Sequence, residues 1–211
     1  DKNITDKEFL DFKSNWLIKN SDYDLIEEYL IKNQIINLHP KLTKFLLDQH
    51  LAEAKVERAC SILSKNLKPI DDKYLTKFNI YCLIKSGKKD EAQLIFDLKK
   101  EQGFKDKYFE KKISYLMGYS TEIDTTISEK TIFDFHLAHQ TNPEFLFEPK
   151  ENTKKIIWEY LNAANLIKLD DDRDKEKLKS LEIAANQNQF DKEKIFNIYS
   201  NITFDLNSLI K

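Results

Sequence analysis

The chain has 211 residues, with 34 basic and 36 acidic side chains and a formal net charge of −2 at pH 7. This balance gives no long-range attraction to nucleic acid or to an anionic membrane surface, so we expect neither as a partner. Glycine occurs only at Gly87, Gly103 and Gly118, which excludes a glycine-rich phosphate-binding loop and predicts no nucleotide cofactor. No apolar run approaches the ~20 residues of a membrane-spanning helix, so we expect no membrane span.

Apolar residues recur throughout the chain at spacings of three and four, and only four prolines interrupt the pattern, which predicts an all-α fold. The first predicted pair of helices carries an apolar stripe on each helix and would form the N-terminal cap of a helical stack. The stripes contain Phe9, Phe12, Trp16 and Leu17 on the first helix, and Leu25, Ile26, Tyr29 and Leu30 on the second.

A four-residue segment occurs twice in the same local setting. Residues 42–45 read Leu-Thr-Lys-Phe, and the same four residues return 33 positions later at 75–78. The same displacement aligns Ala54 with Gly87. A period in the range of roughly 20 to 50 residues is typical of solenoids, so the sequence predicts a stack of antiparallel helix pairs, an α-solenoid.

After Gly103 the repeat register slips, and one further helix is predicted up to Met117. Gly118 then opens a polar stretch. We therefore expect a helical-repeat region over residues 1–118, with about three helix pairs and the further helix. Residues 119–211 would form a C-terminal helical region that packs on this stack within one continuous domain.

The C-terminal region carries four more apolar stripes, which predict helices around residues 132–139, 156–167, 178–185 and 195–199. Thr141 and Glu144, on either side of Pro143, are spaced as a capping box at the start of a short turn. Asp191 is placed to cap the last of the four helices.

Two histidines in the first of these stripes invite a metal-binding interpretation. His136 and His139 lie three positions apart with Asp134 nearby, so both imidazoles could approach one ion. They share the stripe with Ile132 and Phe135, where a half-buried, hydrogen-bonded histidine is the commoner arrangement. No third ligand has a recognisable spacing, so we expect no metal site.

An acidic run resembles the start of a calcium-binding loop through Asp170, Asp172 and Asp174. Lys175 stands where such a loop needs a glycine, and Leu181 stands where it needs a bidentate carboxylate. The segment therefore favours a solvated acidic loop that precedes a helix.

The two cysteines, Cys60 and Cys82, are expected on the inward stripes of neighbouring helices. A disulfide between them is one alternative, and in an oxidising compartment it would join adjacent helix pairs. In a reducing compartment both would be small buried apolar side chains.

The chain has nine tyrosines and fourteen phenylalanines, more than a thin stack of helices needs for its packing. Aromatic side chains on one face of a stack are typical anchors for a bound peptide. Candidates for such a face are Tyr74, Tyr81, Tyr108 and Tyr115. The alternative for each of them is packing between helices.

Residues 75–103 resemble a tetratricopeptide repeat. The turn and second helix carry the match, with Gly87, Asp90, Glu91, Ala92 and Phe96. The chain departs from that family's pattern at Ile80, Lys99 and Phe104. The resemblance implies a right-handed superhelical stack with a concave face for partner peptides.

A second resemblance spans more of the chain. It rests on four short segments at residues 16–17, 59–60, 81–82 and 101–103, which read Trp-Leu, Ala-Cys, Tyr-Cys and Glu-Gln-Gly. They are similar to a group of uncharacterised alphaproteobacterial proteins made with export signals. This implies a periplasmic helical module and assigns no functional residue.

The sequence thus predicts a non-enzymatic α-helical repeat scaffold that mediates protein–protein interaction or assembly, with a protein or peptide as its partner. The alternative is a helical accessory region of a larger enzyme, such as a cell-wall lytic enzyme, with the catalytic residues outside this chain.

Overall fold

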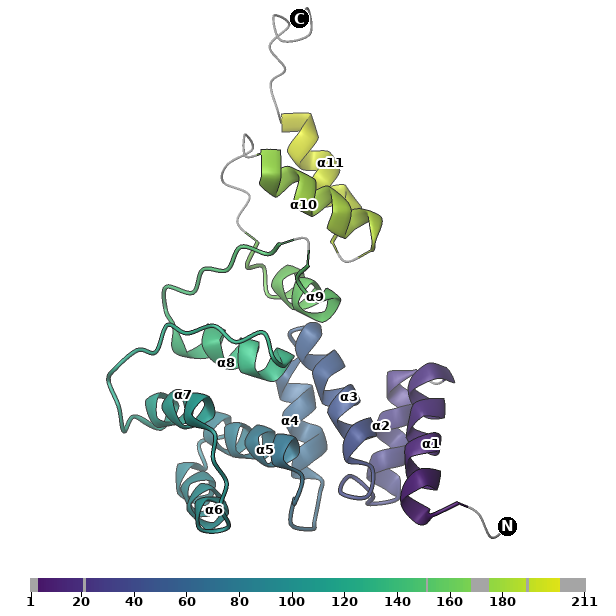
Figure 1. Ribbon diagram of the computed structural model, residues 1–211, viewed down its shortest axis with the longest axis vertical. Coiled ribbons are helices and arrows are strands. Elements are labelled where there is room, and N and C mark those ends of the chain that lie inside the picture. The colour runs from purple at the N-terminus through teal and green to yellow at the C-terminus, as the bar shows by residue number, and fades with distance from the viewer. Residues whose placement is uncertain (1–3, 21, 151, 168–174, 189, 202–211) are drawn as a thin grey trace, which may run out of the picture. The chain divides into compact units, whose positions relative to one another are not determined.

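The computed structural model describes residues 4–20, 22–150, 152–167, 175–188 and 190–201. Within these ranges the chain forms eleven α-helices and no β-strand, so the prediction of an all-α fold is confirmed (Figure 1). The acidic run that includes Asp170, Asp172 and Asp174 lies outside the described residues, and its loop conformation stays a prediction.

The helices follow one another as α1 (Asp6–Asn20), α2 (Tyr23–Lys32), α3 (Pro40–Ala52), α4 (Val56–Ser64), α5 (Lys73–Lys85), α6 (Lys89–Glu101), α7 (Lys107–Met117), α8 (Ile132–Thr141), α9 (Lys155–Ala163), α10 (Lys175–Asn186) and α11 (Lys192–Asn201). Polar side chains cap the starts of several of them. Asp22, Asp72, Asp106 and Thr131 each accept a hydrogen bond from the backbone N–H three positions later.

The chain divides into two compact units, one made of Asp1–Leu51 with Lys55–Phe145 and the other of Ala52–Ala54 with Leu146–Lys211. The sequence suggested a division after Gly118. That position lies inside the first unit, because α8 follows it and packs against α7.

The two Leu-Thr-Lys-Phe segments lie in matching positions within the first unit. They fall in the first turns of α3 and α5, and Leu42 and Leu75 are both fully buried. The Thr43 hydroxyl donates to the Ile36 carbonyl at 3.0 Å, and the Thr76 hydroxyl donates to the Ile70 carbonyl at 3.2 Å. Each threonine therefore fastens its helix to the loop before it.

Helix α5 packs against α4, α6 and α7, which is the set of neighbours that a helix has inside a stack of helix pairs. The turn from α5 to α6 passes through Gly87 at φ +79°, where glycine carries no steric penalty. Ala54 has a φ of 55° in the turn from α3 to α4. The right-handed solenoid itself stays a prediction.

Helix α8 supplies much of the core of the first unit. Its Phe133 is fully buried and stacks on Phe78 of α5, with ring centroids 4.6 Å apart. The same ring makes edge contacts with Tyr74 and Tyr81 and a tilted contact with Phe109 of α7. Phe133 therefore joins α8 to both α5 and α7.

The second unit contains α9, α10 and α11. Its core is formed by Trp158, Leu181, Ala184, Ala185, Phe190 and Ile198. Helix α9 ends at Ala163, earlier than the predicted helix over 156–167, because Asn165 adopts a left-handed conformation at φ 58°. Asp191 precedes α11, and its carboxylate accepts from the Glu193 N–H at 2.9 Å.

The predicted capping box at Thr141 is wrong. Thr141 ends α8, and its hydroxyl donates back to the Leu137 carbonyl at 2.8 Å instead of capping a new turn. Asn142 takes the capping role, since its side-chain oxygen accepts from the Glu144 N–H at 3.1 Å.

A disulfide joins Cys60 of α4 to Cys82 of α5, with the two Cα atoms 5.3 Å apart. It links α4 to α5, two helices that follow one another in the chain and pack together. Because the bonded residues are 22 positions apart, it restricts a loop that includes the whole connection between the helices.

Reduction of this bond is expected to lower the free energy of unfolding by about 3 kcal/mol, because the open chain regains the entropy of that loop. Urea denaturation of the parent chain with and without reductant measures the difference. The variant with both Cys60→Ser and Cys82→Ser should have the same urea midpoint with and without reductant. Equal midpoints for the parent in both conditions would contradict the prediction.

Candidate binding surfaces

Tyr81, one of the four candidate partner-binding tyrosines, is a core residue. It is fully buried on α5, and its hydroxyl lies 2.6 Å from Nε2 of His136 on α8. Its ring also makes an edge contact with Phe78. Tyr81 is therefore not accessible to a partner, and its role is to pack α5 against α8.

Tyr74 and Tyr108 are half-buried on the sides of α5 and α7 that α8 covers. The Tyr74 hydroxyl donates to the Asp48 carboxylate, and Lys44 Nζ lies 3.8 Å from the centre of the Tyr74 ring. Burial, and then the nearby Asp48 carboxylate, raise the pKa of Tyr74 well above its ordinary value. The Tyr108 hydroxyl donates to the backbone carbonyl of Asp134 at 2.8 Å.

These contacts show that the aromatic face expected to hold a foreign peptide is occupied by α8 of the same chain. Tyr115, also on α7, is half-buried, and its proposed role in partner binding stays a prediction. Packing between helices explains the other three tyrosines.

A charged cluster lies beneath α8, and sequence reasoning did not find it. Lys77 is in the apolar stripe of α5, and its ammonium lies 3.0 Å from the Asp134 carboxylate and 3.1 Å from that of Asp106. Burial acts to raise the pKa of Asp106, but the Phe109 N–H and the Lys77 ammonium outweigh it, and the pKa is lowered. Lys77 and Asp134 are 57 positions apart, so no local spacing revealed their pairing.

The two histidines of α8 have separate surroundings. His136 is buried beside Tyr81, and this burial lowers its pKa to about 3, so the ring is neutral at pH 7. His139 is half-buried against the Phe145 ring, with centroids 5.2 Å apart. Among the described residues, no three side chains of His, Cys, Asp or Glu are grouped to hold a metal ion.

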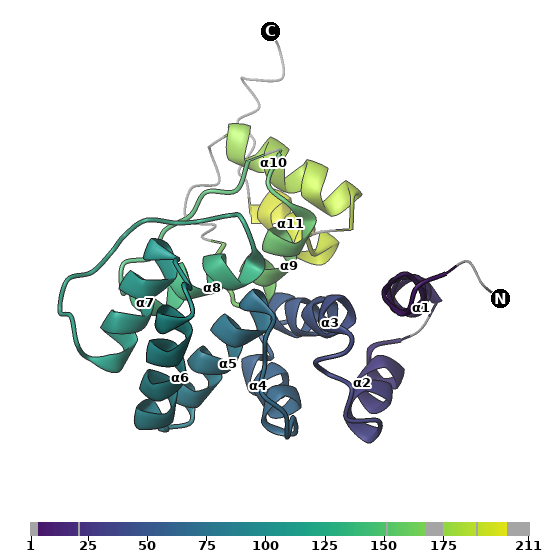
Figure 2. The same ribbon diagram turned by 60° about the horizontal axis from the view of Figure 1, so that its bottom comes forward.

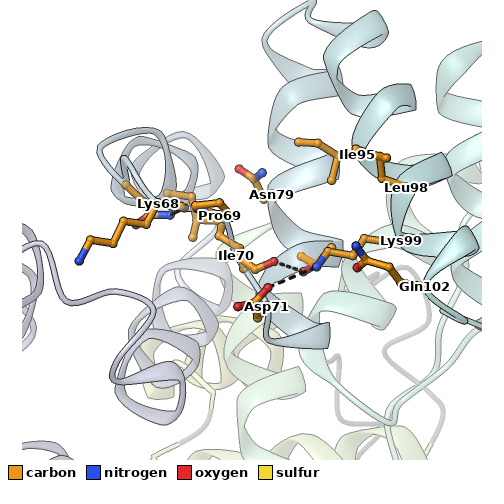
Figure 3. Close-up of a pocket in the computed structure, with 12 residues that line it drawn as sticks. Lys68, Pro69, Ile70, Asp71, Asn79, Ile95, Leu98, Lys99 and Gln102 are labelled. Carbon is orange, nitrogen blue, oxygen red and sulfur yellow. Dashed lines mark hydrogen bonds and ion pairs between the residues drawn. The ribbon is translucent and has the colours of Figure 1, made fainter.

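A groove in the first unit lies between the α4–α5 loop and the facing sides of α5 and α6 (Figure 3). Its volume is about 380 Å³, within the range of sites that bind small ligands or peptide side chains. Its apolar lining comes from Leu63, Pro69, Ile70, Ile95 and Leu98.

The polar lining of the groove consists of three carboxamides and a few charged side chains. The carboxamides belong to Asn66, Asn79 and Gln102, and the ammonium groups belong to Lys68 and Lys99. Each carboxamide offers both a donor and an acceptor. Figure 3 shows Asn79, Ile95 and Leu98 across the groove from the loop residues Lys68 to Asp71.

The loop wall of the groove is fixed by hydrogen bonds at two places. Asn37 donates through Nδ2 to the Pro69 carbonyl at 2.9 Å and to the Lys68 carbonyl at 3.3 Å. Thr76 holds the Ile70 carbonyl from the other side. A ligand would therefore meet a groove whose wall is already in place, which lowers the entropy lost on binding.

A second accessible surface lies on α1, where the sequence predicted an inward stripe. Phe9, Phe12 and Trp16 are 52%, 64% and 54% exposed. The side of α1 that packs on the unit instead carries Ser14, which is buried and lies 3.1 Å from Nδ1 of His39. The predicted inward packing of the three aromatic residues is therefore wrong.

No family model, curated protein or solved structure matches the chain. In the part of the chain that the structure describes, no helix combines the length and apolar character that a membrane span requires. The resemblances to tetratricopeptide repeats and to exported alphaproteobacterial proteins therefore stay expectations.

Proposed function

We propose that the chain is a non-enzymatic α-helical scaffold that binds an extended, acidic segment of another protein in the groove between the α4–α5 loop, α5 and α6. The observation that carries the proposal is the combination of carboxamides, ammonium groups and apolar side chains around one preformed cavity.

An extended peptide matches this lining in three respects. Its backbone N–H and C=O groups can pair with the carboxamides of Asn79 and Gln102. The Asn66 carboxamide is already bonded within the loop, where its Nδ2 donates to the Lys68 carbonyl. An apolar side chain of the peptide would fill the space beside Ile95 and Leu98. Because alternate side chains of an extended segment point to opposite sides, the next side chain would face solvent or the lysines.

The lysines favour a carboxylate on the bound segment. Lys99 pairs with Asp71 at 3.6 Å, but the Asp71 side chain is 95% exposed, so this ion pair contributes little. A carboxylate of the ligand could replace Asp71 on Lys99 and also approach Lys68, which is exposed at the loop. Acidic segments should therefore bind more tightly than basic ones.

The proposal is tested by selecting peptides from a displayed random library on the purified chain and measuring their affinity by fluorescence anisotropy. Selected peptides should be enriched in Asp and Glu. Asn79→Leu should weaken their binding by about tenfold, since one hydrogen bond to the backbone is lost at an apolar site. Lys99→Met should weaken binding of the acidic peptides most.

The matched control is Asn197→Leu, which makes the same change at an exposed site on α11. Peptides that bind the Asn79→Leu variant as tightly as the parent would contradict the proposed site. A library that yields no enriched sequence would contradict the function.

A further inference from the structure

Helix α1 has apolar side chains on two opposite faces, and only one of them is packed. Phe9, Phe12 and Trp16 are spaced at i, i+3 and i+7, so they form one stripe along the helix. Figure 2 shows α1 nearly end-on beside α2 at the edge of the first unit. A terminal helix of a stack ordinarily presents a polar outer face, because an apolar one promotes association.

The charges on α1 indicate what covers the stripe. The first turn is acidic, with Asp6 and Glu8, and the last turn is basic, with Lys19. Glu8 and Lys19 are separated by about three helical turns, so they lie on the same side of the stripe at its two ends. Such a face is complementary to itself when two copies of the helix run in opposite directions.

We infer that two copies of this chain associate through α1, as an antiparallel helix pair about a two-fold axis near Phe12. In this pair Phe12 lies against Phe12 of the second copy, and Phe9 lies against its Trp16. The Glu8 carboxylate of each copy, which also accepts from the Thr5 N–H and hydroxyl of its own chain, then lies beside Lys19 of the other. A two-fold interface uses the same patch on both copies, so both ion pairs form together.

Two further arguments favour a second copy over other occupants. The opposite directions of the paired helices also place the positive end of each helix dipole beside the negative end of the other. Helix α1 carries three acids, Asp6, Glu8 and Asp11, against three lysines, so it has no net charge to attract an anionic membrane surface.

The stripe has only three aromatic side chains, and each is already partly buried within its own chain. The interface is therefore smaller than that of a permanent dimer. The expected dissociation constant is in the micromolar range. This interface is separate from the peptide groove, which involves no residue of α1.

Sedimentation velocity of the purified chain over a series of concentrations tests the inference. The parent should show a concentration-dependent monomer–dimer equilibrium. Phe12→Asp should weaken it by at least about tenfold, since a charge replaces the side chain at the axis. Leu94→Asp is the matched control, because Leu94 is 62% exposed on α6 and should leave the equilibrium unchanged.

A charge exchange tests the antiparallel register. Glu8→Lys alone and Lys19→Glu alone each place like charges across the interface, and each should weaken dimerisation by a few-fold. Mixing the two variants should restore the affinity of the parent, because both ion pairs return in the mixed dimer.

Three results would overturn the inference. The parent chain could stay monomeric at hundreds of micromolar, or Leu94→Asp could weaken dimerisation as much as Phe12→Asp does. The third is a mixture of Glu8→Lys and Lys19→Glu that dimerises no more tightly than either variant alone. Binding of a monomeric parent to vesicles of anionic lipid, abolished by Phe12→Asp, would assign the stripe to a membrane surface instead.

Discussion

Replacing Phe133 with alanine is expected to lower the free energy of unfolding of the first unit by about 3–5 kcal/mol. The ring is fully buried where α8 meets α5 and α7, and it contacts Tyr74, Phe78, Tyr81 and Phe109. Its loss would leave a cavity that four aromatic rings cannot fill without moving their helices. Urea denaturation followed by tyrosine fluorescence measures the change.

Tyr119→Ala is the control for this substitution, because Tyr119 is 65% exposed in the same unit and follows the end of α7. It should change the free energy of unfolding by no more than about 0.5 kcal/mol. If Phe133→Ala changed the free energy of unfolding as little as Tyr119→Ala, packing of α8 on the aromatic side chains of α5 and α7 would not stabilise the first unit.

Replacing Lys77 with methionine is also expected to lower the free energy of unfolding by about 3–5 kcal/mol, in this case for an electrostatic reason. Both Lys77 and Asp134 have only 8% of the side chain exposed, so the substitution leaves the Asp134 carboxylate buried without its cation. The double variant Lys77→Met with Asp134→Leu should recover most of the loss, because it removes both buried charges and leaves only Asp106, whose side chain is 21% exposed and still accepts from the Phe109 N–H. Denaturation of the two single variants, the double variant and the parent gives the coupling energy.

Lys32→Met provides the comparison with an exposed ion pair. Lys32 pairs with Glu28 on α2, where the two side chains are 72% and 50% exposed. This substitution should alter stability by less than about 1 kcal/mol, since solvent already screens the pair. A double variant of the buried pair that is no more stable than Lys77→Met would show that the loss comes from packing rather than from an unpaired charge.

Local patterns in the sequence were sufficient to predict the helical class and most of the helices. Apolar spacing identified α3 to α6, and the glycines at Gly87, Gly103 and Gly118 each adopt positive φ where a helix ends. These features depend on residues within one or two turns of each other, so they are readable from the chain alone.

Features that depend on distant residues were not predictable in the same way. Tyr81 was a candidate for a partner-binding face and Lys77 had no predicted role, because nothing local showed that α8 covers both side chains. Helix α1 has apolar residues around its circumference, so the spacing of Phe9 and Phe12 could not determine which face packs. The groove depends on the loop held by Asn37, and that contact joins residues 32 positions apart.

The covering of Tyr74 and Tyr108 by α8 changes how mutants at these positions should be interpreted. Each hydroxyl is hydrogen-bonded within the chain, so replacing either tyrosine with alanine would lower the stability of the fold whether or not the residue contacts a partner. A weaker complex formed by such a mutant would report unfolding, and only its melting curve would separate the two causes. Assays of partner recognition are therefore better directed at Asn79 or Phe12, where substitution leaves the interior intact.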